Sequence, residues 1–301
     1  MKILIFGGNG QLASELKNLS HVCDKNEYFF ADRKSIDFSL SSNFFDIIND
    51  LTPDIVINAV GYTGVDGAES NSFLATKVNS IAVMDLALAC ARFKVRLIHI
   101  STDYVFDGLK KQEYTESDKC NPLNIYGHSK YLGEEMVRYF TNDYIILRVS
   151  WVFGAYGKNF LKTIIQKSKS VSELSIVCDQ FGGPTPTALI VNCLDQICTL
   201  TLDNNIKTGT YNISGQPYVS WYEFTKNIIS TAQQHKLIKE DIKIIPIKSI
   251  NYESSVKRPN DSRLSINKIK QVLPSMNFNY STYLGDIMAI LSKDKFFYRE
   301  N

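Results

Sequence analysis

The sequence has no long apolar run and no long run of like charge. No stretch of the 301-residue chain approaches the ~20 apolar residues that a membrane span needs, and the N-terminal apolar run, residues 3–6, is too short for a signal peptide. No basic run exceeds two residues, and the formal net charge is only +2. We therefore expect neither nucleic acid nor a membrane surface as a main partner.

Paired cysteines are also missing. The six cysteines form no CxxC pair, and most of them lie in apolar surroundings, so packing in the core is their expected role. The chain shows no internal repeat, linker or low-complexity tract. Together with an ordinary content of apolar and charged residues, these features predict a reduced, cytoplasmic protein.

Apolar runs alternate with helical patterns in the first half of the chain. Such runs are typical of buried parallel strands, and their alternation with helices predicts a sheet covered on both faces. The sequence therefore predicts an α/β fold, a Rossmann-type doubly wound parallel sheet, in a domain over residues 1–152. Strands are expected at 2–6, 28–31, 54–60, 96–101 and 144–150, and helices at 11–19, 42–51, 75–93 and 126–140.

The second half has a looser pattern, which predicts a smaller C-terminal α/β substrate-binding domain over residues 153–301. We expect this domain to cap the carboxyl ends of the sheet strands, with some of its segments returning to the first domain. Helices are expected at 158–169, 186–203, 220–235 and 265–272, and short strands at 175–177, 209–213 and 243–247.

A glycine-rich turn, FGGNGQLASEL, follows the first predicted strand and opens a helix. Gly7 and Gly10 allow a tight turn and a close approach of the backbone to a ligand, and Ala13 takes the third glycine position. The free N–H groups at the start of the helix favour a pyrophosphate. The place of this turn predicts a dinucleotide site, and a purely structural turn is the alternative.

Asp32 and Arg33 stand at the end of the second predicted strand, where a Rossmann protein reads the ribose. Asp32 can accept hydrogen bonds from ribose hydroxyls and would repel a 2′-phosphate, whereas Arg33 can pair with that phosphate. The first residue points to NADH and the second to NADPH, so both cofactors stay open. A solvated loop charge is the alternative for each residue.

Two tyrosines stand four residues before a lysine, Tyr126…Lys130 and Tyr222…Lys226, so the spacing alone decides nothing. Only the first pair follows a predicted Rossmann strand. The end of that strand carries Thr102, at the level where ligands lie in a doubly wound sheet. Tyr126 and Lys130 are one turn apart on one helix face. We predict that they form a functional pair and that the second pair is structural.

A free tyrosine has a pKa near ~10 and is a poor acid at neutral pH. A nearby ammonium favours the phenolate, so we expect Lys130 to lower the pKa of Tyr126. This is the chemistry of a short-chain dehydrogenase. Tyr126 exchanges a proton with the substrate oxygen, Thr102 positions that oxygen, and Lys130 also holds the nicotinamide ribose.

Further motifs accompany this pair, and nearly the whole chain resembles dTDP-4-dehydrorhamnose reductase, a family of extended short-chain dehydrogenases/reductases. The matching stretches are GxxGQL (7–12), DF (37–38), PDIVINAVGYTGVDGAES (53–70), STDYVFDG (101–108), PLNIYGHSKYLGEE (122–135), LRVSWVFG (147–154), KNFLKTI (158–164), DQFGGPT (179–185), SWYEF (220–224) and RPNDSRLS (258–265).

The resemblance implies the reduction of dTDP-4-dehydro-β-L-rhamnose to dTDP-β-L-rhamnose with NADPH or NADH. It implies Thr102, Tyr126 and Lys130 as the catalytic residues. For the cofactor it implies Gly10, Gln11 and Leu12 at the pyrophosphate, Asp32 at the adenosine ribose, Asp37 and Phe38 beside the adenine, and Gly61, Tyr62 and Thr63 at the nicotinamide. For the substrate it implies Thr63, Val65, Asp103 and Trp151 at the sugar, and Arg258 near the nucleotide phosphates. A core position is the alternative for Trp151, and a surface charge is the alternative for Arg258.

Some members of the family bind Mg²⁺ through glutamates at a dimer interface. Glu15 matches one of these glutamates, but the helix expected at 186–203 offers no glutamate partner. We therefore expect no metal, and we expect a monomer or a weak homodimer.

Two other functions stay open. Asp103 is followed by Tyr104 instead of the glutamate that nucleotide-sugar dehydratases use, which argues against dehydration. A reductase of another dTDP-4-keto-6-deoxysugar is compatible with the same residues. A nucleotide-binding regulatory subunit, resembling that of methionine adenosyltransferase, is the non-catalytic alternative.

Overall fold

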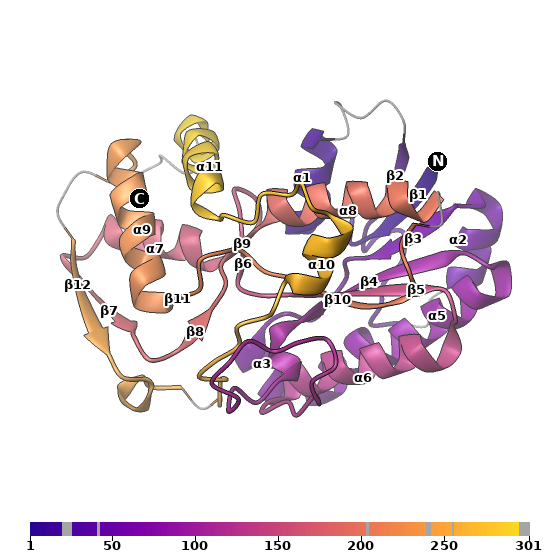
Figure 1. The fold of residues 1–301 in the computed structure, drawn as a ribbon, viewed down its shortest axis with the longest axis horizontal. Helices are drawn as coiled ribbons and strands as arrows, with labels where there is room; N and C mark the ends of the chain where they lie inside the picture. Colours follow the sequence, from indigo (N-terminus) through magenta and orange to yellow (C-terminus); the bar gives the residue numbers. More distant parts are fainter. Residues whose placement is uncertain (20–25, 41–42, 203–204, 239–241, 255, 295–301) are drawn as a thin grey trace.

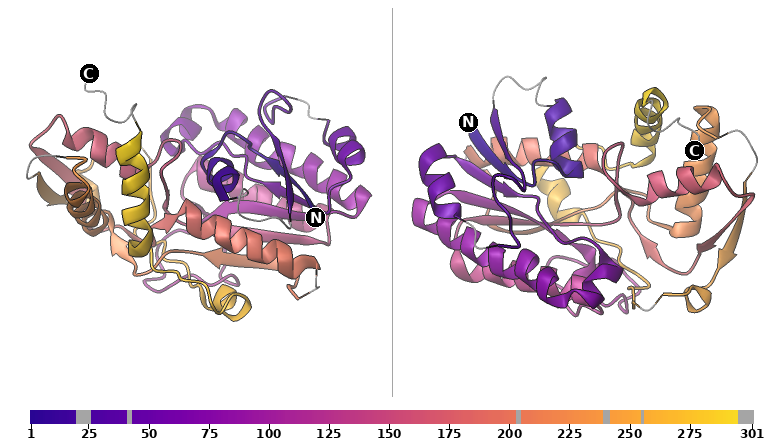
Figure 2. Two further views of the ribbon diagram at one scale, coloured as in Figure 1. Left: turned by 90° about the horizontal axis from the view of Figure 1, so that it is seen from above. Right: turned by 180° about the vertical axis from the view of Figure 1, so that it is seen from behind.

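The computed structural model describes residues 1–19, 26–40, 43–202, 205–238, 242–254 and 256–294. Cys23 and the first residue of the helix expected at 42–51 lie outside these ranges. A central sheet with helices on both faces forms the larger part of the molecule, and a smaller group of helices and short strands lies beside it (Figures 1 and 2).

Six parallel strands form the central sheet, in the order β10-β5-β4-β3-β1-β2. The chain runs outward from β1 to β2 and then returns to β3 on the other side of β1. The strands predicted for the first half are confirmed, although β3 is shorter than expected, and the sixth strand comes from the second half. The strands are β1 (Lys2–Phe6), β2 (Glu27–Ala31), β3 (Ile55–Asn58), β4 (Arg96–Thr102), β5 (Tyr144–Val149) and β10 (Gly209–Ile213).

Side chains of β1 alternate between two separate cores. Ile3 and Ile5 join the core beneath α1 (Gln11–Leu19) and α8 (Thr187–Leu202), which pack together on one face. On the other face, Leu4 and Phe6 pack into the core under three further helices. This alternation places apolar side chains on both faces, as the continuous apolar runs predicted. The helices of the second face are α2 (Phe44–Leu51), α5 (Ala82–Phe93) and α6 (Ile125–Phe140).

The expectation that no stretch is long and apolar enough for a membrane span is wrong for one helical run. Residues 72–93 form a continuous run of α4 (Ser72–Thr76), a π-helical turn η1 (Lys77–Ile81) and α5. By length and composition alone, this run passes the test for a membrane span. A core helix of a soluble fold passes the same test, and more than half of this run is buried, with α5 packed against α2 and α6.

The second half of the chain has its own apolar core, in which Phe153, Phe224 and Tyr280 pack edge to face. The predicted helices and strands are present, and a final helix, α11, was not predicted. The helices are α7 (Phe160–Ser168), α9 (Trp221–Gln234), α10 (Asn267–Val272) and α11 (Ser281–Lys293). The strands pair as β7 (Glu173–Val177) with β12 (Lys243–Ile247), β8 (Phe181–Gly182) with β11 (Val219–Ser220), and β6 (Val152–Phe153) with β9 (Thr185–Pro186).

Two glycines let α6 approach its neighbours at backbone distance. A Cβ on Gly127 would collide with the carbonyl oxygen of Tyr104, and a Cβ on Gly133 would collide with that of Asn79. The Asn124 side chain caps the helix by accepting the N–H of Gly127 at 2.8 Å. The position of α6 against η1 and against η2 (Asp103–Val105), the 3-10 turn that follows β4, is therefore fixed by the absence of side chains at two positions.

Replacing Gly133 with Ala tests this contact. Helix propensity favours alanine by up to ~1 kcal/mol. We nevertheless expect the unfolding free energy in urea to fall by about 1–3 kcal/mol, because the added methyl overpacks the contact with η1. His128→Ala, at an exposed position of the same helix, serves as the control. An unchanged or increased stability of Gly133→Ala would show that α6 has room to move.

Candidate active site

A first cavity, of about 380 Å³, opens beyond β1 and β3, where the strand order reverses. Ligands of open parallel sheets bind at such a point. Gly7 has a φ of +97°, and a Cβ on it would lie 3.1 Å from the Ala59 backbone, so this position requires glycine for conformation and for space. The predicted cofactor residues that line the cavity are Gly7, Gly10, Asp32, Arg33, Asp37, Phe38, Gly61 and Tyr62.

The two residues expected to read the ribose are held differently. Oδ1 of Asp32 accepts the N–H groups of Lys34 and Ser35 at 2.9 and 3.1 Å. The Ser35 N–H contributes most to lowering the pKa of Asp32, so this residue presents a carboxylate at neutral pH. Arg33 is 79% exposed, and its Nε donates to Oδ2 of Asp37 at 2.9 Å.

Five predicted cofactor residues do not line this cavity, namely Gln11, Leu12, Thr63, Tyr126 and Lys130. Oε1 of Gln11 accepts a hydrogen bond from Nδ2 of Asn159 at 3.0 Å. Leu12 is buried in the core beneath α1. Thr63 is exposed in the loop after β3, and Val65, expected at the sugar, begins α3 (Val65–Ser70).

Lys130 lies beside the first cavity and Tyr126 lies beside a second one, although neither residue lines either cavity. Nζ of Lys130 is buried and donates to the carbonyl of Ile100 at 2.6 Å. A Cβ on Gly61, which lines the first cavity, would lie 3.9 Å from this Nζ. The Tyr126 ring packs edge to face on Tyr104, which lines the second cavity, with 5.7 Å between the ring centroids.

Thr102 completes this group at the end of β4. Its side chain is hydrogen-bonded to that of Tyr126, and its Oγ1 also accepts the N–H of Tyr104 at 3.2 Å. The structure therefore brings the three residues predicted as catalytic together at the carboxyl end of the sheet.

The expectation that Lys130 lowers the pKa of Tyr126 is wrong for this structure. Burial raises the pKa of Tyr126 to about 12, the hydrogen bond with Thr102 opposes the rise, and the Asp103 charge adds to it. Burial also lowers the pKa of Lys130 to about 8, against the opposing effect of Glu134. Loss of water therefore dominates both groups, and the Lys130 ammonium contacts a backbone carbonyl.

Asp103 carries a buried carboxyl group and lies next to Thr102. Its Oδ1 accepts from Oγ1 of Thr102 at 3.2 Å, and its Oδ2 accepts from Oγ of Ser150 at 3.1 Å. Burial raises its pKa to about 6, although hydrogen bonds with Ser262, Ser150 and Thr102 oppose the rise. A weakly acidic group therefore lies beside the hydroxyls of Thr102 and Tyr126.

The second cavity, of about 970 Å³, is lined by residues of both halves of the chain, from Tyr104 to Asn260. Arg258 lines it and donates from one terminal nitrogen to both Asp66 oxygens, at 2.9 and 2.8 Å. Trp151 stacks on Trp221, another lining residue, with 3.4 Å between ring centroids and 5° between ring planes. Arg258 is thus anchored in the cavity wall, and Trp151 lies directly behind it.

Asn79 belongs to the site and was missed from the sequence. It is fully buried in η1, where its Oδ1 accepts the N–H of Tyr62 at 2.8 Å and its Nδ2 donates to Oγ of Ser129 at 2.9 Å. It therefore fixes the loop after β3 to the helix that carries Tyr126 and Lys130. A polar amide within the apolar run of residues 72–93 was the available signal.

The second tyrosine–lysine pair and the candidate metal ligand lie elsewhere. Tyr222 packs on the core of the second half, with Nζ of Lys226 5.6 Å from its ring centroid. Glu15 is buried and accepts a hydrogen bond from Oγ1 of Thr187 at 2.6 Å, and burial raises its pKa. Within the described residues, no three His, Cys, Asp or Glu side chains form a group able to hold a metal.

The Asp103 carboxyl should make stability depend on pH. Its pKa is higher in the folded protein, about 6, than its ordinary value of 3.8, so its stabilising effect is complete below pH 4 and is lost as the pH rises through 6. Asp103→Asn should remove this pH-dependent decrease in the free energy of unfolding, which corresponds to about 3 kcal/mol. Urea unfolding between pH 4 and 8 measures it, with Asp50→Asn, at an exposed position, as the control. Parallel pH profiles of wild type and Asp103→Asn would contradict a buried, weakly acidic Asp103.

Comparison with known proteins identifies the family. A family model described as the RmlD substrate binding domain matches residues 1–292. The curated dTDP-4-dehydrorhamnose reductase of Aggregatibacter actinomycetemcomitans is 37% identical over 289 residues, which are 96% of this chain and 98% of that protein. Solved dTDP-4-dehydrorhamnose reductases of Clostridium acetobutylicum and of Bacillus anthracis, the latter in complex with NADP, both match with a TM-score of 0.87. They are 32% and 31% identical, and the matches cover 97% and 96% of this chain and 99% and 98% of theirs. The chain belongs to the dTDP-4-dehydrorhamnose reductase family.

Proposed function

We propose that this protein reduces dTDP-4-dehydro-β-L-rhamnose to dTDP-β-L-rhamnose with NADPH or NADH. The observation that carries the proposal is that Lys130 neighbours one cavity through Gly61 and Tyr126 neighbours another through Tyr104. One cavity lies at the strand reversal beside a glycine-rich turn, and the other, of about 970 Å³, has the size of a site for a nucleotide sugar. The names of the relatives supply the sugar, and the NADP complex of one relative supports the cofactor.

The first cavity fits a dinucleotide. The turn at Gly7 and Gly10 leads directly into α1, so the free N–H groups at the start of this helix are available to a pyrophosphate. The nicotinamide, when bound, supplies the hydride for C4 of the sugar. We assign Gly7, Gly10, Gln11 and Leu12 to the pyrophosphate, Asp32, Arg33, Asp37 and Phe38 to the adenosine end, and Gly61, Tyr62, Thr63, Tyr126 and Lys130 to the nicotinamide end.

Residues of this chain supply the proton. As the 4-keto group is reduced, the Tyr126 hydroxyl gives its proton to the sugar oxygen, and the hydroxyl of Thr102 holds the same oxygen. A pKa of about 12 keeps Tyr126 protonated at neutral pH, which is the form that a reduction needs. The Lys130 ammonium holds the nicotinamide ribose and stabilises the phenolate that forms during the step.

The second cavity takes the nucleotide sugar. Arg258 presents a planar fork suited to a diphosphate, at the wall that it shares with Tyr104. Asp103 and Thr102 lie at the sugar end, next to the proton donor. We assign Thr63, Val65, Thr102, Asp103, Tyr126, Trp151 and Arg258 to the substrate.

The two proposed binding sites also suggest how the chain divides into domains. We propose that residues 1–152 form the NAD(P)-binding domain, that residues 153–301 form the substrate-binding domain, and that later segments such as β10 complete the first. We further propose a cytoplasmic enzyme that works as a monomer or weak homodimer without Mg²⁺. The hydrogen bond from Thr187 to Glu15 favours an enzyme that works without Mg²⁺, because it ties the Glu15 carboxylate to a neighbouring helix.

The proposal is tested by mixing the protein with dTDP-4-dehydro-β-L-rhamnose and following the oxidation of NADPH and of NADH. We expect turnover and the formation of dTDP-β-L-rhamnose. Turnover with a different dTDP-4-keto-6-deoxysugar alone would change the substrate. Binding of the cofactor without turnover of any such sugar would favour the regulatory-subunit alternative.

Tyr126→Phe should lower kcat by ~10²–10⁴-fold, because it deletes only the proton donor. Cofactor binding, followed by nicotinamide fluorescence, should stay within a few-fold of wild type. Tyr222→Phe is the matched control, since it removes the hydroxyl of the other tyrosine–lysine pair, and its kcat should be almost unchanged. Equal losses in the two variants would mean that the pair is misassigned.

Cofactor preference should depend on Asp32 and Arg33. We expect wild type to use both cofactors with a preference under ~30-fold, because an exposed charge such as Arg33 changes binding by only about 1–2 kcal/mol. Asp32→Ala should shift the kcat/KM ratio toward NADPH, and Arg33→Ala should shift it toward NADH. Lys34→Ala, an exposed neighbour, should leave the ratio unchanged. A ratio that stays the same in all three variants would place the reading of the ribose elsewhere.

A further inference from the structure

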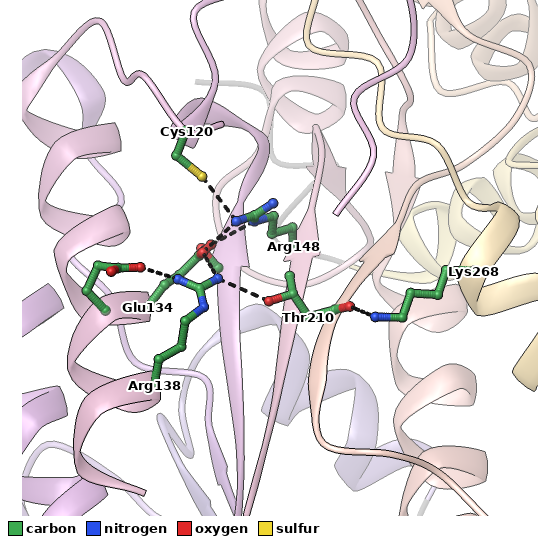
Figure 3. Close-up of polar contacts among 8 residues, drawn as sticks. Cys120, Glu134, Arg138, Arg148, Thr210 and Lys268 are labelled. Atoms are coloured by element: carbon green, nitrogen blue, oxygen red, sulfur yellow. Dashed lines mark hydrogen bonds and ion pairs between the residues drawn. The ribbon is translucent and has the colours of Figure 1, made fainter. Parts of the chain in front are cut away.

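The carboxylate of Glu134 is fully buried and joins three elements of the fold (Figure 3). From β4, Oγ of Ser101 donates to Oε1 at 2.5 Å. From β5, Arg148 donates to both oxygens, with Nε 2.9 Å from Oε1 and a terminal nitrogen 2.8 Å from Oε2. From α6 itself, Arg138 donates to Oε2 at 2.7 Å. Such a set of charge-assisted bonds fixes α6 against both strands.

Glu134 is the buried negative charge that pairs with both arginines of this cluster, Arg138 and Arg148. Arg148 is 2% exposed, while Arg138 is 28% exposed and also pairs with Glu135. Burial alone would raise the pKa of Glu134, but the charges of Arg148 and Arg138 and the hydrogen bonds of Arg148 and Ser101 outweigh it and hold that pKa below its ordinary value. The carboxylate is therefore ionised, and a buried charge is retained only where it is well paired.

The same carboxylate stands next to the catalytic pair along both the helix and the strand. Tyr126, Lys130 and Glu134 follow one another at intervals of four residues, on one face of α6. Along β4, the Ile100 carbonyl accepts from Lys130, and the next residue, Ser101, donates to Glu134. Thr102 comes directly after Ser101. Successive residues of β4 thus bind successive turns of α6, and the Ser101–Glu134 hydrogen bond is the second of these contacts after that of Ile100 with Lys130.

We propose that Glu134 is a positioning residue of the catalytic pair, which holds Lys130 and Tyr126 in register with Thr102 and supplies a counter-charge of the Lys130 ammonium. The role rests on the proposed reductase function. Of the causes that shift the pKa of Lys130, burial lowers it and the Glu134 charge raises it. Loss of Glu134 should therefore leave Lys130 neutral over a wider range of pH.

Other ionisable groups surround this helix and enter the same balance. His99 on β4 has a pKa lowered well below its ordinary value, first by burial and then by the charges of Lys130 and Arg138, so it stays neutral at neutral pH. The remaining ones on elements packed against α6 are Asp66 and Glu69 on α3, Lys77 on η1, Asp85, Cys90 and Arg92 on α5, Asp103 and Tyr104 on η2, Arg96 on β4, and Tyr144 and Arg148 on β5.

The experiment measures the titration of Lys130 directly. Nitrogen-15 NMR of lysine-labelled protein follows the Nζ signal between pH 6 and 11, and the signal is assigned by its loss in Lys130→Met. In Glu134→Gln we expect the midpoint of Lys130 to fall by at least one pH unit, which is a tenfold change in the protonation equilibrium. Because this variant leaves Arg148 without its carboxylate, Glu134→Gln/Arg148→Met is measured in parallel, so that no uncompensated buried charge remains.

Glu135→Gln is the matched control, because Glu135 is the next residue, pairs with Arg138 and is 44% exposed. Its midpoint should stay within about 0.2 units of wild type. Ser101→Ala breaks the link to β4 without removing a charge, so it should lower kcat severalfold while the midpoint stays near that of wild type. For the two Glu134 variants, the alkaline limb of the kcat profile should move to lower pH by the same amount as the midpoint, with the KM of the sugar changed less than threefold.

A Lys130 midpoint that is unchanged in a folded Glu134 variant, or that moves equally in Glu135→Gln, would overturn the inference. The NMR titration does not depend on turnover. If wild type failed to reduce the dTDP-sugar, the proposed function would fall, while the shift of the Lys130 midpoint would still decide whether Glu134 supplies its counter-charge.

Discussion

The packing of α6 against β4 and η1 is the contact on which the site depends. Gly127 and Gly133 remove the side chains that would hold the helix away from the Tyr104 and Asn79 backbones. The face of α6 that is brought inward carries Tyr126, which packs on Tyr104 in the wall of the second cavity, and Lys130, which lies near Gly61 in the wall of the first. The position of this one helix thus sets where Tyr126 and Lys130 lie relative to both cavities.

Loss of water controls the chemistry of the site more strongly than neighbouring charges do. Burial is the largest cause of the pKa changes of Tyr126, Lys130 and Asp103, and in each case it favours the uncharged form. A reductase begins with a protonated phenol and creates charge only as the proton leaves. A dry site that keeps its groups close to neutral before reaction is suited to this direction, because the charge that develops meets preoriented partners.

The sequence predicted the sheet correctly, and it predicted that Thr102, Tyr126 and Lys130 come together at the ends of the strands, for identifiable reasons. Buried parallel strands leave continuous apolar runs, and the order of glycine turn, Thr102 and Tyr126 follows the order of the strand ends. The effect of Lys130 on Tyr126 could not be predicted, because it depends on burial that spacing does not encode. Asn79 and Glu134 were missed for a related reason, because their partners are distant in the sequence. Asn79 binds Tyr62, 17 residues away, and Glu134 binds Ser101 on β4 and Arg148 on β5. The last helix, α11, carried a pattern that was not recognised.

The origin of β10 has a consequence for how the protein is made. This strand covers the outer edge of β5 through residues 209–213, which pair with residues 145–149, although more than 50 residues separate them in the chain. Until the ribosome has synthesised β10, the outer edge of β5 has no neighbouring strand. Exposed strand edges of this kind can pair with other chains. The first half of the chain cannot complete its sheet alone, so a fragment that ends near residue 152 would expose the edge of β5 and would be prone to aggregate.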